Sequence, residues 1–315
     1  MARLRNLNCL FVSALGLMAC GGPSSGDGDA ESGTDAEDSS SESNGETASE
    51  TGGAEAQRFE LREGVIVEVQ PDGQTTLEVD GRTTVTFSSR GLVARTFNED
   101  ILGTTAIYEF DRSNEATTPL DVFVGASQDD AGVYVDWEDV DGQRSARMHL
   151  YNPTGEEHTG LTHVDFTLEG DAPDSLALAV NCDDDGSFHG FGGQYNQSDQ
   201  RGEAFPLIVQ EQGIGRDPDV VEDGLIKLNG GEHTTYFPAP YFLDQRGHGL
   251  HIDTPRHVHV DLCADDPELA WFEVVDGRPL AMEVLHGPDP AAVIDQYGSL
   301  VGRPATPPDW AFMPW

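Results

Sequence analysis

Short runs of strand-forming residues, separated by turn residues, constrain the fold of this chain more than any other feature. Apolar and polar side chains alternate within many of these runs, and Gly, Asp or Pro stands between them. A period of two is typical of strands with one buried face, and Asp-Gly steps are typical of tight turns. The runs cover 65–69, 76–79, 84–87, 122–124, 132–135, 163–166, 176–180 and 257–260. Many short strands with little helix predict an all-β fold, a large antiparallel β-sandwich.

One helix is predicted near the C-terminal end, over residues 289–303. Asp289 can cap it, Pro290 suits its first turn, and apolar residues then repeat at helical spacing as far as Gly302. The prolines that follow cannot continue a helix. The apolar residues from 309 to 315 therefore predict the beginning of a strand.

The N-terminus predicts export. Two arginines precede an apolar run from Leu7 to Ala19, which is too short to span a bilayer but suits a signal peptide over residues 1–19. Cys20 follows Leu-Met-Ala, a sequence similar to a bacterial lipobox, so we expect cleavage before Cys20 and lipidation of its thiol. Gly21 is not an acid of the kind that retains lipoproteins in the inner membrane, which favours the outer membrane. An ordinary signal peptide with a chance cysteine is the alternative.

The segment 20–56 consists mostly of Gly, Ser, Thr, Asp and Glu. Such a composition buries too little apolar surface to offset chain entropy, so we expect a disordered tether. The domain boundaries predicted from these patterns are signal peptide 1–19, lipidated cysteine and linker 20–56, sandwich 57–288, linking helix 289–303 and the start of a further domain at 304–315.

The charge balance excludes one class of partner. The chain has 17 basic and 57 acidic residues, a formal net charge of −40. Phosphate would be repelled over the whole approach, so no nucleic acid partner is expected. The glycine run 190–193 lacks the lysine of a nucleotide loop, and no cofactor is predicted.

Two cysteines remain for the folded part. Cys182 and Cys263 are a candidate disulfide pair in an oxidising compartment, with two buried free thiols as the alternative. His257 and His259 are two apart on a predicted strand and point to one face, a geometry that suits a metal. The sequence identifies no third ligand for them. We therefore predict two strand histidines and no metal site.

Three blocks, in this order, resemble the N-terminal half of family 31 α-glycoside hydrolases: residues 188–194 (FHGFGGQ), 236–242 together with 246–253, and 287–311. The resemblance extends over residues 59–315. It implies a galactose mutarotase-like sandwich, a carbohydrate partner with an α-glycosidic bond, and a (β/α)8 catalytic barrel whose first strand is expected at 304–315.

The resemblance also implies that both catalytic aspartates of the family lie on that barrel. No catalytic residue is assigned here, the barrel is expected to be missing or separately encoded, and the chain by itself is expected to be inactive. The runs 201–207 and 211–216 are similar to the sulfoquinovosidase branch, which hydrolyses α-glycosides of a sulfonated sugar. At Gly193 the sequence departs from the glutamate of the family.

The family bend at 190–193 implies a loop that reaches the barrel mouth. The candidate sugar contacts on this loop are Gln194, Asp199, Arg201, Glu211, Gln212 and Arg216. The alternative, chiefly for Asp199 with Arg201, is an arginine–carboxylate network that stabilises the loop. Trp271 and Phe272 could stack on a sugar, although a place in the core is favoured.

The function predicted is the N-terminal, carbohydrate-binding part of an exported, lipid-anchored α-glycoside hydrolase. The second hypothesis is a non-enzymatic surface lipoprotein that binds glycan or protein through its sandwich.

Overall fold

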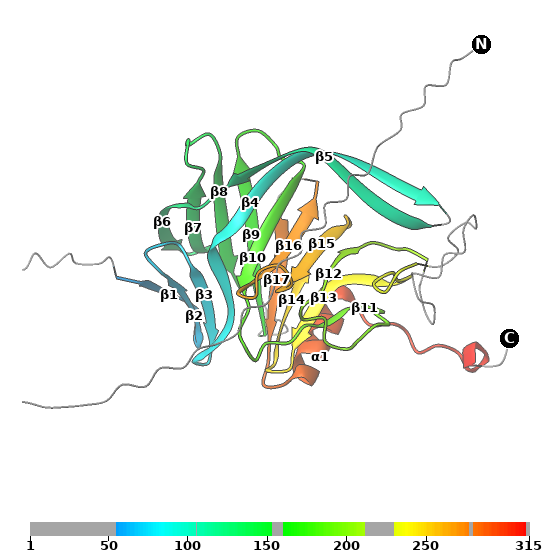
Figure 1. The fold of residues 1–315 in the computed structure, drawn as a ribbon. Helices are drawn as coiled ribbons and strands as arrows, with labels where there is room; N and C mark the ends of the chain where they lie inside the picture. Colours follow the sequence, from blue (N-terminus) through cyan, green and yellow to red (C-terminus); the bar gives the residue numbers. More distant parts are fainter. Residues whose placement is uncertain (1–54, 105, 153–159, 212–229, 277–279, 313–315) are drawn as a thin grey trace, which may run out of the picture. The chain divides into compact units, whose positions relative to one another are not determined.

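The strands of this chain form two antiparallel sheets. The structure is a computed structural model, and it describes residues 55–104, 106–152, 160–211, 230–276 and 280–312. Sheet A has nine strands in the order β1-β2-β3-β4-β10-β16-β15-β12, with β5 also paired to β4, and sheet B has eight in the order β11-β13-β14-β17-β9-β8-β7-β6. Figure 1 shows the strands of both sheets with their labels, coloured along the chain.

The strands of sheet A are β1 (Gln57–Arg62), β2 (Val65–Val69), β3 (Thr75–Val79), β4 (Arg82–Thr104), β5 (Ile107–Pro119), β10 (Ser175–Asn181), β12 (Ala204–Leu207), β15 (Val258–Leu262) and β16 (Leu269–Val275). The strands of sheet B are β6 (Val122–Asp129), β7 (Gly132–Glu138), β8 (Ser145–Tyr151), β9 (Leu161–Glu169), β11 (His189–Gly192), β13 (Pro238–Asp244), β14 (His248–Ile252) and β17 (Leu280–His286).

The alternation seen in the sequence has the expected meaning in space. In β15 the valines and the leucine are buried, whereas His259 and Asp261 are turned to the other face and are only half-buried. Aromatic rings join the two inner faces: Phe87 of β4 meets Phe166 of β9 edge-on, with ring centroids 6.2 Å apart. The all-β sandwich prediction is confirmed. The galactose mutarotase-like assignment stays a prediction.

A long hairpin was not predicted. Strand β4 continues well beyond the run at 84–87, and its last part pairs with β5 from Asn98 opposite Ser113 to Thr104 opposite Ile107. We call residues 98–104 and 107–113 the arm. In Figure 1 the arm extends away from the sandwich as a two-stranded ribbon. Half-buried and exposed side chains do alternate along the arm part of β5, since Tyr108, Phe110 and Arg112 are half-buried and the residues between them are exposed, so a period-two signal was present and was not recognised.

Helix α1 (Pro290–Val301) confirms the predicted helix. The Asp289 carboxylate accepts a hydrogen bond from the Ala292 amide at 2.9 Å, which caps the first turn. Val293 is fully buried in a small cluster with residues of β9, β13 and β17. The ring of Tyr297 stacks on that of Tyr241, with centroids 3.8 Å apart. The apolar stripe therefore packs on the outer face of sheet B.

The segment after the helix differs from the expected strand. Residues Asp309–Phe312 form a turn of 3₁₀ helix, η2, in which the Ala311 amide donates to the Pro308 carbonyl at 2.9 Å. A strand needs a neighbour for its backbone groups, and no strand in the described ranges pairs with these residues. Neither described helix is long and apolar enough to cross a membrane.

Cys182 and Cys263 form a disulfide. They follow β10 and β15, and they are separated by 81 residues in the sequence. The bond thus joins two distant segments at one end of sheet A.

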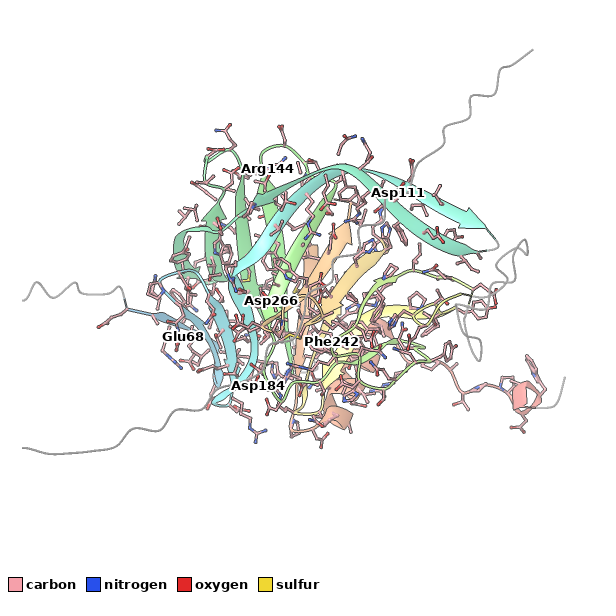
Figure 2. All side chains as sticks on the ribbon, in the orientation of Figure 1. Glu68, Asp111, Arg144, Asp184, Phe242 and Asp266 are labelled. Carbon is pink, nitrogen blue, oxygen red and sulfur yellow. A yellow bond between two sulfur atoms is a disulfide. The ribbon has the colours of Figure 1, made fainter. Side chains whose placement is uncertain are left out.

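Figure 2 places Phe242 within the sandwich and Asp184 at its surface, as expected for a chain whose many acids are solvated.

His286 is a buried ionisable group at the end of β17. Its side chain continues the inward-facing row of Met282 and Val284 and is only 7% exposed. Nε2 has no hydrogen-bond partner among the described residues. Burial, and next the nearby charge of Arg62, lower the pKa of His286 from 6.5 to about 4, while Asp80 opposes the shift. The folded chain therefore holds this imidazole neutral.

This burial predicts acid sensitivity. Between pH 6.5 and about 4 the unfolded chain binds a proton at His286 that the folded chain does not, so the free energy of unfolding falls as the pH falls through this range. One such group contributes up to about 1.4 kcal/mol per pH unit. We expect His286→Gln, which cannot titrate, to flatten the dependence by this amount in urea unfolding at several pH values. An unchanged slope in the variant would contradict the assignment.

Candidate functional site

The glycine-rich run forms a sharp bend that is anchored in the core. We call residues 188–211 and 230–237 the rim loops. Strand β11 pairs with β13, and the register shifts between Gly190 and Gly192. Phe191 has a left-handed φ of 61° and is 1% exposed. Its ring meets Phe205 edge-on at 5.7 Å and stacks on Phe242 at 5.6 Å. This buried ring fixes where the rim loops leave the sandwich.

Gly192 allows two rim segments to approach each other. Its φ is 85°, and a side chain there would collide with the carbonyl of Phe237. The Gly193 amide donates to that same carbonyl at 2.8 Å, and the Thr235 hydroxyl donates to the Gly193 carbonyl at 2.8 Å. Residues 192–193 and 235–237 are therefore held together through their backbones.

Gln194 presents an unsatisfied acceptor beside this contact. Its Nε2 donates to the Phe191 carbonyl at 3.1 Å, which orients the amide. Its Oε1 is buried and has no hydrogen-bond partner among the described residues. A buried acceptor without a partner costs free energy unless a ligand or water supplies a donor. The arrangement suits an incoming hydroxyl group.

Exposed aromatic rings belong to the two segments that this backbone contact joins. Tyr195 and Tyr236 are each 49% exposed, and Phe237 is 71% exposed. The Tyr236 hydroxyl donates to the Glu211 carboxylate, and this hydrogen bond raises the pKa of Tyr236, so the phenol stays protonated. A group of exposed rings beside polar acceptors marks a binding surface more often than a free one.

The arm supports the rim loops from the other side. The Glu211 amide donates to the Ala106 carbonyl at the arm tip at 2.7 Å. The Tyr108 amide donates to Gln210 Oε1 at 2.9 Å, and Gln210 is 3% exposed. The position of Glu211 thus depends on a hairpin that lies about a hundred residues earlier in the chain.

Asp199 and Arg201 bind backbone groups instead of each other's charges. Asp199 Oδ1 accepts from the amides of Phe188 at 2.9 Å and Arg201 at 3.1 Å. The Arg201 guanidinium donates to the carbonyls of Asp183 at 2.7 Å and Gly186 at 3.2 Å. Both side chains stabilise the loop, in keeping with the structural alternative, although through backbone contacts and not through the expected ion pair.

A polar network under the rim was missed in the sequence. Gln200 is 1% exposed and exchanges hydrogen bonds with the Asn196 amide group. His233 contacts the Glu203 carboxylate at 3.0 Å and stacks on Phe205, with ring centroids 4.5 Å apart.

Tyr236 and Phe237 were noticed only as part of the family resemblance. Two successive exposed aromatics were the available signal, since a core strand would bury at least one of them.

Some expected site residues cannot be placed. Gln212, Arg216 and Cys20 lie outside the described residues. Phe272 is 1% exposed and belongs to the core, which excludes it as a sugar platform, whereas Trp271 is half-buried on the outer face of sheet A.

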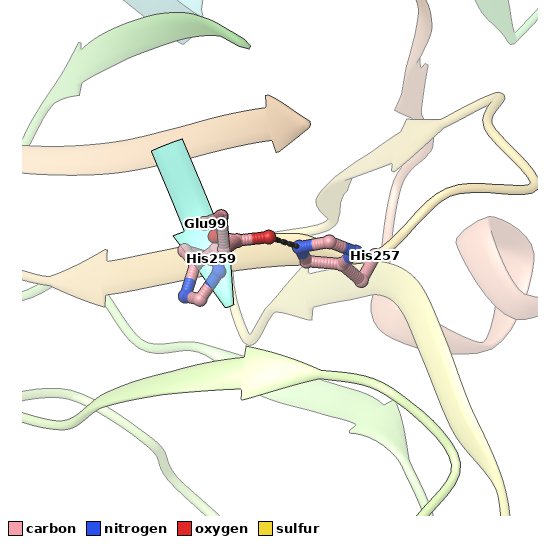
Figure 3. Close-up of side chains that lie close together, drawn as sticks. All are labelled: Glu99, His257 and His259. Atoms are coloured by element: carbon pink, nitrogen blue, oxygen red, sulfur yellow. Dashed lines mark ion pairs between the residues drawn. The ribbon is translucent and has the colours of Figure 1, made fainter. Parts of the chain in front are cut away.

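His257 and His259 do have a third neighbour, which the sequence did not identify. The ligand atoms of Glu99, His257 and His259 lie within 4.8 Å of one another, as Figure 3 shows. Glu99 belongs to the arm and reaches the outer face of sheet A, where its Oε2 is 3.4 Å from His257 Nε2. The sequence could not reveal Glu99, because only the fold of the arm brings it to these histidines.

Comparison with known proteins places these features in a family. No protein-family model matches the chain. The chain is 30% identical over 142 residues to a sulfoquinovosidase of Escherichia coli, and 29% identical over 157 residues to one of Agrobacterium fabrum. These matches cover 44% and 48% of the chain.

A solved family 31 sulfoquinovosidase from E. rectale, in complex with an aza-sugar inhibitor, matches the fold with a TM-score of 0.63 over 78% of the chain at 19% identity. The resemblance to family 31 glycoside hydrolases is confirmed. The chain spans about a fifth of the length of the two curated relatives and 35% of the solved family 31 chain. The matches therefore concern one region of larger family 31 proteins.

The contact at Gly192 can be tested with a matched pair of glycines. Gly192 and Gly202 both have φ near 85°, but an added Cβ at Gly202 meets nothing within 4 Å. Both substitutions by Ala strain the backbone, whereas only Gly192→Ala also collides with Phe237. We expect Gly192→Ala to lower the free energy of unfolding by roughly 1–3 kcal/mol more than Gly202→Ala, measured by urea denaturation. Equal losses would contradict the close approach.

Proposed function

We propose that this chain is the N-terminal, carbohydrate-binding part of an exported α-glycoside hydrolase, and that its rim loops contact the sugar. The observation that carries the proposal is that the segment with the unpartnered Oε1 of Gln194 is joined through its backbone to the segment with the exposed rings of Tyr236 and Phe237. A sugar offers hydroxyl donors along its edge and apolar C–H groups on its faces. Gln194 suits the former and the rings suit the latter.

The similarity to sulfoquinovosidases and the family 31 fold supports the assignment to α-glycosides. The matched region is about a fifth of the curated relatives. In this proposal the two carboxylates that cleave the glycosidic bond belong to the part of the family architecture outside the match, and the rim loops supply contacts at the edge of the sugar site. The acidic partner of Tyr236, Glu211, fixes one ring of that edge.

Sugar binding is tested by saturation-transfer NMR of the chain with methyl α-glucoside and with the α-methyl glycoside of a sulfonated glucose. We expect transfer to at least one of them. We expect Gln194→Ala to weaken binding about three- to tenfold, because one hydrogen bond to the sugar is lost. Tyr236→Ala removes a ring and the Glu211 contact, and a similar or larger loss is expected.

Tyr134→Ala is the matched control for these variants, because it removes a tyrosine that stacks on His149 of sheet B. This variant should bind both glycosides as the wild type does in the saturation-transfer measurement. If neither glycoside receives saturation, or if the control weakens binding as much as Gln194→Ala does, the rim loops are not the contact surface.

We also propose that Cys20 anchors the chain to the outer membrane through lipid. The support is in the sequence alone: a basic, then apolar N-terminus, Leu-Met-Ala before the cysteine and an acidic segment after it. A long spacer would allow the sandwich to reach polymeric substrate at a distance from the membrane.

Lipidation is tested by expressing the chain in bacteria fed an alkyne-tagged fatty acid. We expect the label on the wild type and its loss in Cys20→Ser. Cys9→Ser is the matched control, since Cys9 lies inside the predicted signal peptide and should not affect labelling. Equal labelling of all three proteins, or of none, would contradict an anchor at Cys20.

A further inference from the structure

Glu99, His257 and His259 meet under the arm, away from the rim loops. His257 directly precedes β15, His259 belongs to it, and both side chains lie on the outer face of sheet A. Glu99 of β4 lies against them. The ring of Phe110, from β5, covers both imidazoles with centroid distances of 5.1 and 5.0 Å. The cluster therefore lies between two layers of the fold and not on an open surface.

We propose that these three side chains form a binding site for a divalent transition metal, with Zn²⁺ as the best match. Two imidazoles and one carboxylate are a ligand set that Zn²⁺ accepts, whereas Mg²⁺ and Ca²⁺ prefer oxygen ligands only. This inference does not depend on the proposed function in carbohydrate binding.

The spacing of the donors suits this ion. Zn²⁺ holds nitrogen and oxygen ligands at about 2.0–2.2 Å, so two neighbouring ligands of a tetrahedral site are about 3.3 Å apart. His257 Nε2 and Glu99 Oε2 are 3.4 Å apart. The widest separation in the cluster is at most 4.8 Å and must shorten by up to about 1.5 Å, which is within the reach of side-chain rotation.

The donor atoms are available. Nε2 of His257 and Nε2 of His259 are both buried and make no hydrogen bond to any described residue. His257 Nε2 is 3.4 Å from the Glu99 oxygen, and His259 Nε2 has no hydrogen-bond partner among the described residues, so one cation between the three would satisfy both nitrogens.

The carboxylate is held in place by its surroundings. Arg112 Nε donates to Glu99 Oε1 at 2.8 Å, which leaves Oε2 turned toward His257. The guanidinium of Arg112 also binds the Glu273 carboxylate at 2.9 Å. Partners of this kind orient metal ligands and tune their affinity.

The local charge favours a cation despite Arg112. The neighbouring charged groups are the carboxylates of Glu99, Glu115 and Glu273 and the guanidinium groups of Arg95 and Arg112, three negative against two positive. The whole chain carries −40, which raises the concentration of cations near its surface. A cavity of about 430 Å³, lined in part by His259, Glu273 and Trp271, provides a route and a place for a fourth ligand such as water.

Metal binding would hold the arm in place on sheet A. The ion would tie Glu99 of the arm to β15 of sheet A, and the arm tip in turn contacts Gln210 and Glu211 of the rim loops. Fixing the base of the arm in this way would hold its tip more firmly.

The test is a titration of the chelator-treated full chain with Zn²⁺ by calorimetry, in excess Mg²⁺ so that sites made only of carboxylates are saturated. We expect one Zn²⁺ per chain. His259→Asn and Glu99→Gln should each weaken binding by at least about tenfold, because losing a ligand costs no less than losing one of its supporting partners. The matched control is His149→Asn, a histidine of sheet B that stacks between two tyrosines, and it should bind as the wild type does.

Two further measurements on the wild type keep the test independent of variant folding. Co²⁺ should bind at the same site and give the intense visible bands of a four- or five-coordinate ion with nitrogen ligands. Hydrogen exchange of the arm amides should slow when Zn²⁺ is added. Absence of saturable Zn²⁺ binding, a weak octahedral Co²⁺ spectrum, or wild-type affinity in His259→Asn would each overturn the proposal.

Discussion

Each sheet of this chain has one extended apolar face, and neither is stable in water until that face is covered by the other. The alternating residues of β15 and the ring pair Phe87–Phe166 show how this requirement is met. The buried ring of Phe191 belongs to the same core, and the bend of the rim loops begins there. The position of the candidate sugar surface therefore follows from the packing of the sandwich interior.

The outer face of sheet A is organised by a second interaction, the buried carboxylate of Glu273. It accepts from Ser175, Arg95 and Arg112, and these partners outweigh the effect of burial and lower the pKa of Glu273. Removing one partner of such a buried group usually costs about 3–5 kcal/mol. Arg112 belongs to the arm, so this ion pair fixes the arm on the sheet. Both Glu99 and the arm tip that contacts Glu211 are placed by that attachment.

Much of the sandwich was predictable because its signal is local. In runs such as 65–69 and 257–260 the alternation of apolar and polar residues predicts which side chains are buried. Asp289 and Pro290 predict the start of the helix. The place of the arm and the turn η2 were not predictable for the opposite reason. The place of the arm depends on the pairing of β4 with β5 and on its contacts with distant residues of sheet A, and the segment at 309–312 has no pairing partner in the described part of the chain. Apolar character alone does not make a strand.

The sequence by itself determined the alternation that forms the two sheets, the helix with its cap, and the family resemblance of the rim loops. Each of these depends only on residues that are close together in the sequence. Only the tertiary structure decided that Asp199 and Arg201 bind backbone, that Gln194 Oε1 is left without a partner, and that Glu99 joins His257 and His259. Each of these outcomes depends on which distant segments share a small volume. That is set by the packing of the arm and the sheets, a property that no local pattern of residues encodes.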